Sequence, residues 1–297
     1  MPTAKPAQIR PRCIFCRDPG KPITEEHFFA KWMTDMLGEN DRANFTAYTL
    51  GAYNSDLETG EKEGIELAHQ KWSGPARSQK FRIACRDCNS GWMSAIEGAA
   101  KPILSRLYEG AAGHLSAEEQ AAFAAWAVLK AIEGQHSTST PPRVSEAQVA
   151  LMYESNAALT DGWWVWVGRQ DSERRLTYAG CNAIASRPDG TEFTAFTLSL
   201  YFGQTYICVF HSLDLPVPET LRELLGWKMT QVWPVVSGAA NLMFRPALAT
   251  VEALRIANAL GAAYSDYDPE TPPPIEQWVD EKRAAWERRG NAGAENG

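Results

Sequence analysis

The sequence has no long hydrophobic run. No stretch approaches the length of about 18 uncharged apolar residues that a membrane-spanning helix requires, so we expect no membrane partner. Residues 1–12 are basic and contain prolines, and they lack the apolar core of about 7 to 15 residues that a secretory signal needs. We therefore expect a cytoplasmic location.

Disorder is excluded as the default state of the chain. Apolar residues make up 44% of its 297 residues, and it contains 11 Trp, 11 Phe and 9 Tyr. A solvated coil does not carry this much aromatic surface, which is typical of packed globular proteins. The length allows one large domain or two of ordinary size.

Basic residues are not in excess overall, because 29 Lys and Arg face 36 Asp and Glu for a net charge of -7. This balance argues against a polyanionic partner for the chain as a whole, but the distribution is uneven. Residues 1–110 have a net charge of +1 and the remainder -8, while residues 1–31 and 77–110 are each +3 and residues 32–76 are -5. Any contact with nucleic acid is therefore expected on the two basic segments.

Cysteine is also scarce, with six residues in the chain, so a disulfide framework is not expected. Four of the six form two C-x-x-C pairs, Cys13 with Cys16 and Cys85 with Cys88. Two such pairs can supply four thiolates to one tetrahedral zinc ion, and four Cys ligands leave no open position, which predicts a structural zinc. The alternative is two unrelated pairs of free thiols.

The hydrophobic pattern predicts an α+β fold. Residues 38–79 form an acidic, glycine-containing insert that we expect to be loop, with one hairpin near Asn54 and Gly60. The remaining expectations are a strand at 81–84 and a helix from 89 or 90 that Pro102 interrupts; helices at 116–133, ended by Gly134, and at 145–154; antiparallel strands at 163–167, 176–180, 196–202 and 205–210; and helices at 218–225, 246–260 and 275–289.

The residues around the cysteine pairs resemble a known family. Glu26 and His27 stand in the phrase ITEEHFFAKW, and Asn89 follows Cys88 directly in the phrase FRIACRDCNSGW. Together with the four cysteines, they resemble the zinc-bracketed HNH endonucleases of the ββα-metal (His-Me finger) class, in the endonuclease VII-like motif arrangement. The resemblance covers about residues 10 to 105. It implies a small zinc-stapled ββα-metal module.

The resemblance also implies residue roles. His27 would be the general base, and Glu26 and Asn89 would hold one catalytic divalent cation, Mg²⁺ or Mn²⁺, separate from the zinc. An Asn carbonyl oxygen at a helix start suits such an oxygen-seeking ion. The implied reaction is hydrolysis of phosphodiester bonds, in which neutral His27 takes a proton from the attacking water. Asn54 and Asn44 are candidates for the asparagine that commonly orients the base.

Four basic residues flank the second cysteine pair and are candidate phosphate contacts, although each of them can equally be a solvated surface charge: Arg77, Lys80, Arg82 and Arg86. Glu97 is expected to be a surface residue of its helix rather than a further ligand. The histidines outside the motif and Cys181 and Cys208 are expected to be surface or core residues, and the tryptophans at 163, 164 and 166 are expected to pack in the core rather than stack on bases.

The expected organisation is a nuclease module at residues 1–110, a helical connector at 111–160, an α+β domain of unknown role at 161–290, and a disordered tail at 291–297. The favoured function is a metal-dependent endonuclease acting on nucleic acid, with DNA as the expected partner. One alternative is a catalytically degenerate module that keeps the zinc fold and binds nucleic acid or protein. Another is a zinc scaffold whose function lies in the C-terminal half.

Overall fold

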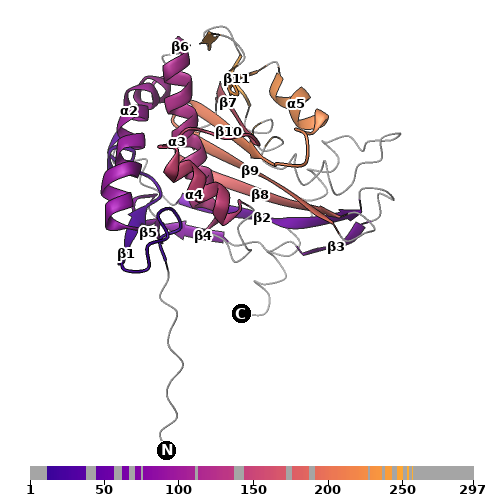
Figure 1. Ribbon diagram of the computed structural model, residues 1–297. Coiled ribbons are helices and arrows are strands. Elements are labelled where there is room, and N and C mark those ends of the chain that lie inside the picture. Colours follow the sequence, from indigo (N-terminus) through magenta and orange to yellow (C-terminus); the bar gives the residue numbers. More distant parts are fainter. Residues whose placement is uncertain are drawn as a thin grey trace, which may run out of the picture.

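The computed structural model combines helices with mainly antiparallel sheets, so the α+β expectation is confirmed (Figure 1). The parts of the chain that the structure describes are residues 12–37, 45–56, 62–66, 71–74, 76–110, 113–136, 144–171, 176–186, 191–226, 228–235, 238–242, 246–249, 253 and 256. Among the helices within these ranges, none has the combination of length and apolar character that crossing a membrane requires.

An eight-stranded sheet forms the largest part of the fold. Its order is β11-β7-β10-β9-β8-β2-β3, and β4 also pairs with β2. All of these pairs are antiparallel except β2 with β8, which is parallel. The strands are β2 (Phe45–Asp56), β3 (Lys62–Glu66), β4 (Lys71–Gly74), β7 (Trp163–Arg169), β8 (Leu176–Ser186), β9 (Glu192–Phe202), β10 (Thr205–His211) and β11 (Met229–Trp233).

Strand β10 is covered on both faces, which explains why its sequence is apolar almost throughout. Ile207 and Val209 belong to the core cluster that includes the helix α3 (Ala117–Gln135), whereas Cys208 and Phe210 belong to a second cluster with α5 (Glu219–Gly226). Successive residues of a strand point to opposite faces, so a strand buried on both sides has no polar alternation. Figure 1 shows α3 and α5 on different sides of these strands.

The acidic insert is more ordered than its composition suggests. The predicted hairpin is present as β2 and β3, with Asn54 opposite Glu63 and Ser55 opposite Lys62. The long strand β2, in contrast, was not predicted, and it runs parallel to β8 over residues 48–56. Strands from both sides of the expected boundaries at residues 110 and 160 therefore share one sheet. The division of the chain into a nuclease module, a helical connector and a second domain stays a prediction.

A second, two-stranded sheet lies beside the helices. It pairs β1 (Ile23–His27) with β5 (Lys80–Cys85) antiparallel, with a bulge between Thr24 and Glu26. The short helix α1 (Lys31–Met36) follows β1, and the 3₁₀ turn η2 (Ala76–Ser78) precedes β5. After β5 the chain forms the π-helix η3 (Cys88–Met93), which continues into α2 (Ser94–Tyr108). A third sheet pairs β6 (His114–Ser116) with β12 (Ala239–Asn241), and β6 directly precedes α3 in the chain.

Two helix starts follow their sequence signals closely. Ser116 caps α3 in a capping box with Glu119, and Ser145 caps α4 (Glu146–Glu154) in a second box with Gln148. Each box satisfies backbone N–H groups that the first helical turn leaves without partners. The strands expected at 163–167 and 176–180 and the hairpin turn at Gly203 are also confirmed, as is the helix expected at 218–225. Trp163 and Trp166 are buried in the core.

Other expectations were wrong. Pro102 lies inside α2 and does not end it. Because proline has no N–H group, the Gly98 carbonyl loses its helical hydrogen bond, but both residues are exposed and this carbonyl can face water. Gly134 does not end α3 but lies within it, where an added Cβ would be 3.1 Å from Leu198 Cδ1. The helix expected at 246–260 is confirmed only in part: residues 246–249 are not helical and Leu248 bridges to Gln170, whereas Ala253 and Ile256 are helical and the Ala253 N–H donates to the Ala249 carbonyl at 3.0 Å. The helix expected at 275–289 and the tail at 291–297 lie outside the described residues.

Candidate metal centre and active site

The four cysteines of the two pairs come together as predicted. Their Sγ atoms all lie within 4.8 Å of one another, and the Sγ atoms of Cys16 and Cys85 are 3.7 Å apart. In a zinc tetrathiolate with bonds of about 2.3 Å, the sulfur-to-sulfur edge of the tetrahedron is about 3.8 Å. The cluster can therefore hold a metal ion such as zinc, and the donor set fits one.

Local backbone geometry builds this cluster. The first pair lies in a turn in which the Arg17 N–H donates to the Cys13 carbonyl at 3.0 Å, and Arg17 has a positive φ of 57°. The Ile14 N–H donates to the Ile83 carbonyl at 3.0 Å, which joins this turn to β5. The second pair spans the end of β5 and the start of η3, so the cluster fastens the N-terminal turn to the strand-helix junction.

The electrostatics of the thiols favour a bound cation. Burial raises the pKa of Cys13, but backbone N–H groups of Cys85, Cys16 and Phe15 donate to its sulfur and bring its pKa below the usual value. Burial and the negative charge on Cys13 raise the pKa of Cys88 well above its usual value. Four thiolates at this separation repel one another unless a cation neutralises them, and zinc binding deprotonates its ligands.

Glu26, His27 and Asn89 line one hollow of about 440 Å³ that opens to solvent. Strand β1 supplies Glu26 and His27, and the π-helix η3, which follows β5, supplies Asn89. The other lining residues are Glu25, Ala30, Lys31, Trp32, Asp35 and Glu97. The structure thus brings together the three predicted site residues. We refer to this feature as the hollow.

Adjacent side chains of β1 line the same hollow although they differ in burial. Glu26 is buried, with 7% of its surface exposed, whereas Glu25 and His27 on either side are exposed. The register of the β1–β5 pair also shifts here: two steps along β1, from Thr24 to Glu26, face three steps along β5, from Ala84 to Phe81, so the extra residue lies on β5. A buried carboxylate and an exposed imidazole therefore line the same space.

The surroundings of the Glu26 carboxyl group disfavour its ionised form. Burial raises its pKa to about 7, although the positive charge of Lys130 acts against this and the negative charge of Glu97 adds to it. The Asn89 side chain, which lines the same hollow, lowers the pKa of Glu26 because it stabilises the ionised carboxylate. A π-helical turn at Asn89 is consistent with a functional site, because such turns are frequent at functional positions.

His27 is suited to accept a proton near neutral pH. Burial lowers its pKa, and the neighbouring Lys80 lowers it further, while Glu25 and Glu97 act in the opposite direction. Lys80 lies directly opposite His27 in the β1–β5 pair, and its amine is 3.1 Å from Glu25 Oε2. A lowered pKa keeps the imidazole neutral at pH 7, the form that a general base requires.

Sequence reasoning missed a buried ionic cluster behind the hollow. Glu97 is not the surface residue that we expected, since it lines the hollow and only 18% of its side chain is exposed. Its carboxylate lies 2.8 Å from the Lys130 ammonium, which is also 3.0 Å from Glu133. Lys130 and Glu133 are fully buried in α3. The available signal was charge at i,i+3 spacing within the otherwise apolar stretch FAAWAVLKAIEG.

The remaining candidates are the four basic residues near the second cysteine pair and the two asparagines proposed to orient the base. Lys80, Arg82 and Arg86 have exposed side chains on β5 and just after it, and Arg77 belongs to η2. Asn54 lies on β2, in the large sheet, and Asn44 lies outside the described residues. Their roles in binding nucleic acid or in orienting the base stay predictions.

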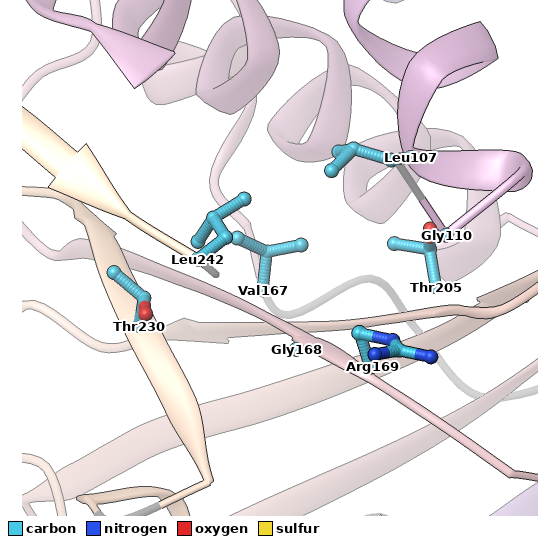
Figure 2. A pocket seen from close by; sticks show the side chains of 8 residues that line it. All are labelled: Leu107, Gly110, Val167, Gly168, Arg169, Thr205, Thr230 and Leu242. Atoms are coloured by element: carbon cyan, nitrogen blue, oxygen red, sulfur yellow. The ribbon is translucent and has the colours of Figure 1, made fainter. Parts of the chain in front are cut away.

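A second cavity lies away from these residues, between the end of α2 and strands β7, β10 and β11. Figure 2 shows its lining, in which Leu107, Val167 and Leu242 surround a space of about 10 Å³. This volume is about that of one water-sized probe. It is a packing defect of the core, too small for a substrate.

Comparison of the chain with protein families, with curated proteins and with solved structures finds no match.

Proposed function

We propose that this protein is a metal-dependent endonuclease that hydrolyses phosphodiester bonds in DNA. The observation that carries the proposal is the convergence of Glu26, His27 and Asn89 on one open hollow, beside a four-cysteine cluster that fastens the supporting elements. An imidazole with a lowered pKa beside two oxygen ligands has the composition of a hydrolytic metal site.

The roles that we assign to these residues follow from their burial. Glu26 and Asn89, which line the same hollow, would hold Mg²⁺ or Mn²⁺ through oxygen atoms, the ligands these ions prefer. Such an ion neutralises charge on the phosphate and the departing oxygen when it is bound. His27, exposed and neutral, takes a proton from the attacking water. The four cysteines would hold zinc as a structural ion.

The charge around the hollow suits a divalent cation. Glu26, Glu97 and Glu133 all interact with the ammonium of Lys130, and no other ammonium contributes to this cluster among the residues that the structure describes. With all four groups ionised, the cluster carries an excess of two negative charges. The raised pKa values of Glu26, about 7, and Glu133, about 8, have the same origin, because burial and mutual repulsion disfavour the ionised carboxylates.

Exposed basic residues on β5 and just after it support a polyanionic substrate. Lys80 lies opposite His27, and Arg82 and Arg86 are exposed along the same segment. Positive charges at such positions attract the phosphate backbone and do not depend on base sequence. The proposal therefore includes DNA binding without a stated target sequence.

Supercoiled plasmid nicking tests this function. We expect the zinc-loaded protein to nick plasmid with Mg²⁺ or Mn²⁺, and we expect His27→Ala to reduce the rate by at least about 100-fold, the usual contribution of a general base. His114→Ala, which changes an exposed histidine on β6, is the matched control and should leave nicking unchanged. Zinc content should be the same in all three proteins.

One observation favours a second candidate, a zinc-stabilised module that binds nucleic acid or protein without cutting. The buried ammonium of Lys130 already acts on the Glu26 carboxyl group and so partly replaces a metal charge. This candidate predicts DNA retention that survives His27→Ala, with no nicking in either metal.

A further inference from the structure

Lys130 is a cation in the interior of the protein. It lies on α3, its side chain is fully buried, and its ammonium contacts Glu97 Oε1 at 2.8 Å and Glu133 Oε2 at 3.0 Å. The same ammonium lies 5.8 Å from the centre of the Phe28 ring, directly after His27 in the chain. Its neighbours thus come from α2, from α3 and from the end of β1.

Such a cluster is an unusual element of a core. Removing charges from water costs free energy that their attraction recovers only with good geometry, and apolar replacements are often as stable or more stable. Glu133 is fully buried and contacts the Lys130 ammonium in the core. Glu97 contacts the same ammonium and also lines the hollow. The cluster therefore has one end in the core and one end in the candidate active site.

We propose that Lys130 is a positioning residue that fixes the Glu97 carboxylate, so that Glu97 supplies a further oxygen ligand to the divalent cation in the hollow. This inference rests on the proposed function, because it assumes a cation between Glu26 and Asn89. A glutamate side chain loses much rotamer freedom when it is ordered, and an ion pair formed before the cation arrives carries part of that cost.

The inference adds to the motif a residue from outside it. The resemblance covers about residues 10 to 105, whereas Lys130 lies on a helix packed between α2 and the large sheet. It also distinguishes the two carboxylate ends of the cluster: Glu97 binds the cation, and Glu133 balances the charge of Lys130 in the core.

The direction in which removal of Lys130 changes the affinity for a divalent cation distinguishes a positioning role from a purely electrostatic one. If Lys130 acted only through its charge, removing it would strengthen binding of a divalent cation nearby. If it positions Glu97, its removal weakens binding, and the loss disappears once Glu97 can no longer act as a ligand. A double-mutant cycle on Lys130 and Glu97 measures this dependence directly.

The experiment is calorimetric titration of Mn²⁺ into the zinc-loaded full chain. All variants of the cycle carry Glu133→Gln, so that Lys130→Met leaves no unpaired carboxylate in the core. We expect Lys130→Met to weaken Mn²⁺ binding by about tenfold or more, as loss of an orienting partner does, and Lys130→Arg to restore most of it. With Glu97→Gln also present, Lys130→Met should cause little further loss.

A second variant keeps the test decisive should Lys130→Met fail to fold. Glu97→Gln alone alters a partly exposed side chain, and it should weaken Mn²⁺ binding by about tenfold or more in the otherwise unchanged chain. The inference is overturned by unchanged binding in Glu97→Gln, by tighter binding in Lys130→Met, or by independent, additive losses. Each of these results leaves the proposed function standing if Glu26→Gln abolishes binding. If Glu26→Gln binds Mn²⁺ like the unchanged chain, the proposed cation site fails and this inference fails with it.

Discussion

The Sγ atoms of Cys16 and Cys85 lie 3.7 Å apart, although 69 positions separate the two residues in the chain. The insert between them contributes β2, β3 and β4 to the large sheet, so the chain leaves the candidate site, crosses to the sheet and returns. A metal ion at the cysteines would fix the point of return, and with it the positions of β5 and Asn89 relative to β1.

The first prediction concerns this metal. We expect one zinc per chain by elemental analysis, and we expect Cys16→Ser to lower zinc content and the melting temperature, because one of four ligands is weakened. Cys16 is the most exposed of the four, so its substitution disturbs the core least. The control is Cys181→Ala, a buried cysteine outside the cluster, which should retain full zinc content. Equal zinc in both variants would contradict a four-cysteine site.

The elements that the sequence predicted well are those with local signals. The capping boxes at Ser116 and Ser145 and the turn at Gly203 each depend on a few neighbouring residues. The cysteine cluster was also predictable, because two C-x-x-C pairs with identical spacing are typical of a shared metal site. Glu26, His27 and Asn89 were selected through their resemblance to a motif, and the structure brings them to the same hollow.

What the sequence could not predict depends on contacts between distant segments. The parallel pairing of β2 with β8 joins residues more than 100 positions apart, and no local pattern encodes it. Lys130 and Glu97 meet only because α2 packs against α3. Gly134 fits inside α3 because Leu198 of the sheet approaches its Cα, a tertiary reason that outweighs the tendency of glycine to end helices.

The second prediction contrasts two glycines. Gly203 has a φ of +56°, and a Cβ there would lie 2.7 Å from the Tyr108 carbonyl oxygen, so Gly203→Ala should lower the free energy of unfolding by about 1–3 kcal/mol. Gly98 lies in α2 with nothing within 4 Å of an added Cβ, so Gly98→Ala should raise it by up to about 1 kcal/mol. Urea denaturation of both variants measures this. Similar effects in both would contradict the close contact between α2 and the β9–β10 turn.

The third prediction concerns pH and His211. Burial lowers the pKa of His211 to about 4 from 6.5, and its Nε2 lies 2.8 Å from the Gln148 side-chain nitrogen. The amide nitrogen is a donor, so His211 Nε2 is the acceptor and the ring is neutral. As pH falls from 6.5 toward 4, the unfolded chain binds a proton that the folded chain does not, and stability decreases.

The expected size of this effect is about 2 kcal/mol between pH 7 and pH 5, because each pKa unit corresponds to about 1.4 kcal/mol. Urea denaturation at both values measures it. In His211→Gln the difference between the two pH values should shrink by about this amount, whatever the absolute stability of the variant. An unchanged pH dependence would show that His211 is not held neutral in the folded protein.

The fourth prediction concerns two exposed basic residues, Arg82 on β5 and Arg86 just after it. Arg82→Ala and Arg86→Ala should each weaken DNA binding and reduce the slope of log affinity against log salt concentration by about 1, the effect of losing one phosphate contact. Arg222→Ala, at an exposed position of α5, is the matched control and should change neither quantity. A salt slope that is unaffected in Arg82→Ala and Arg86→Ala would place the DNA elsewhere on the protein.

The hydrolytic role of the hollow is tested most directly by plasmid nicking with the unchanged protein and with Asn89→Ala, at equal zinc content and in saturating Mg²⁺ or Mn²⁺. Asn89 lines the hollow together with Glu26 and is not one of the four clustered cysteines, so its substitution affects the cation site rather than the structural one. The account predicts nicking by the unchanged protein and a loss of at least about tenfold in Asn89→Ala. Nicking at the same rate by both proteins, or by neither in either metal, would contradict it.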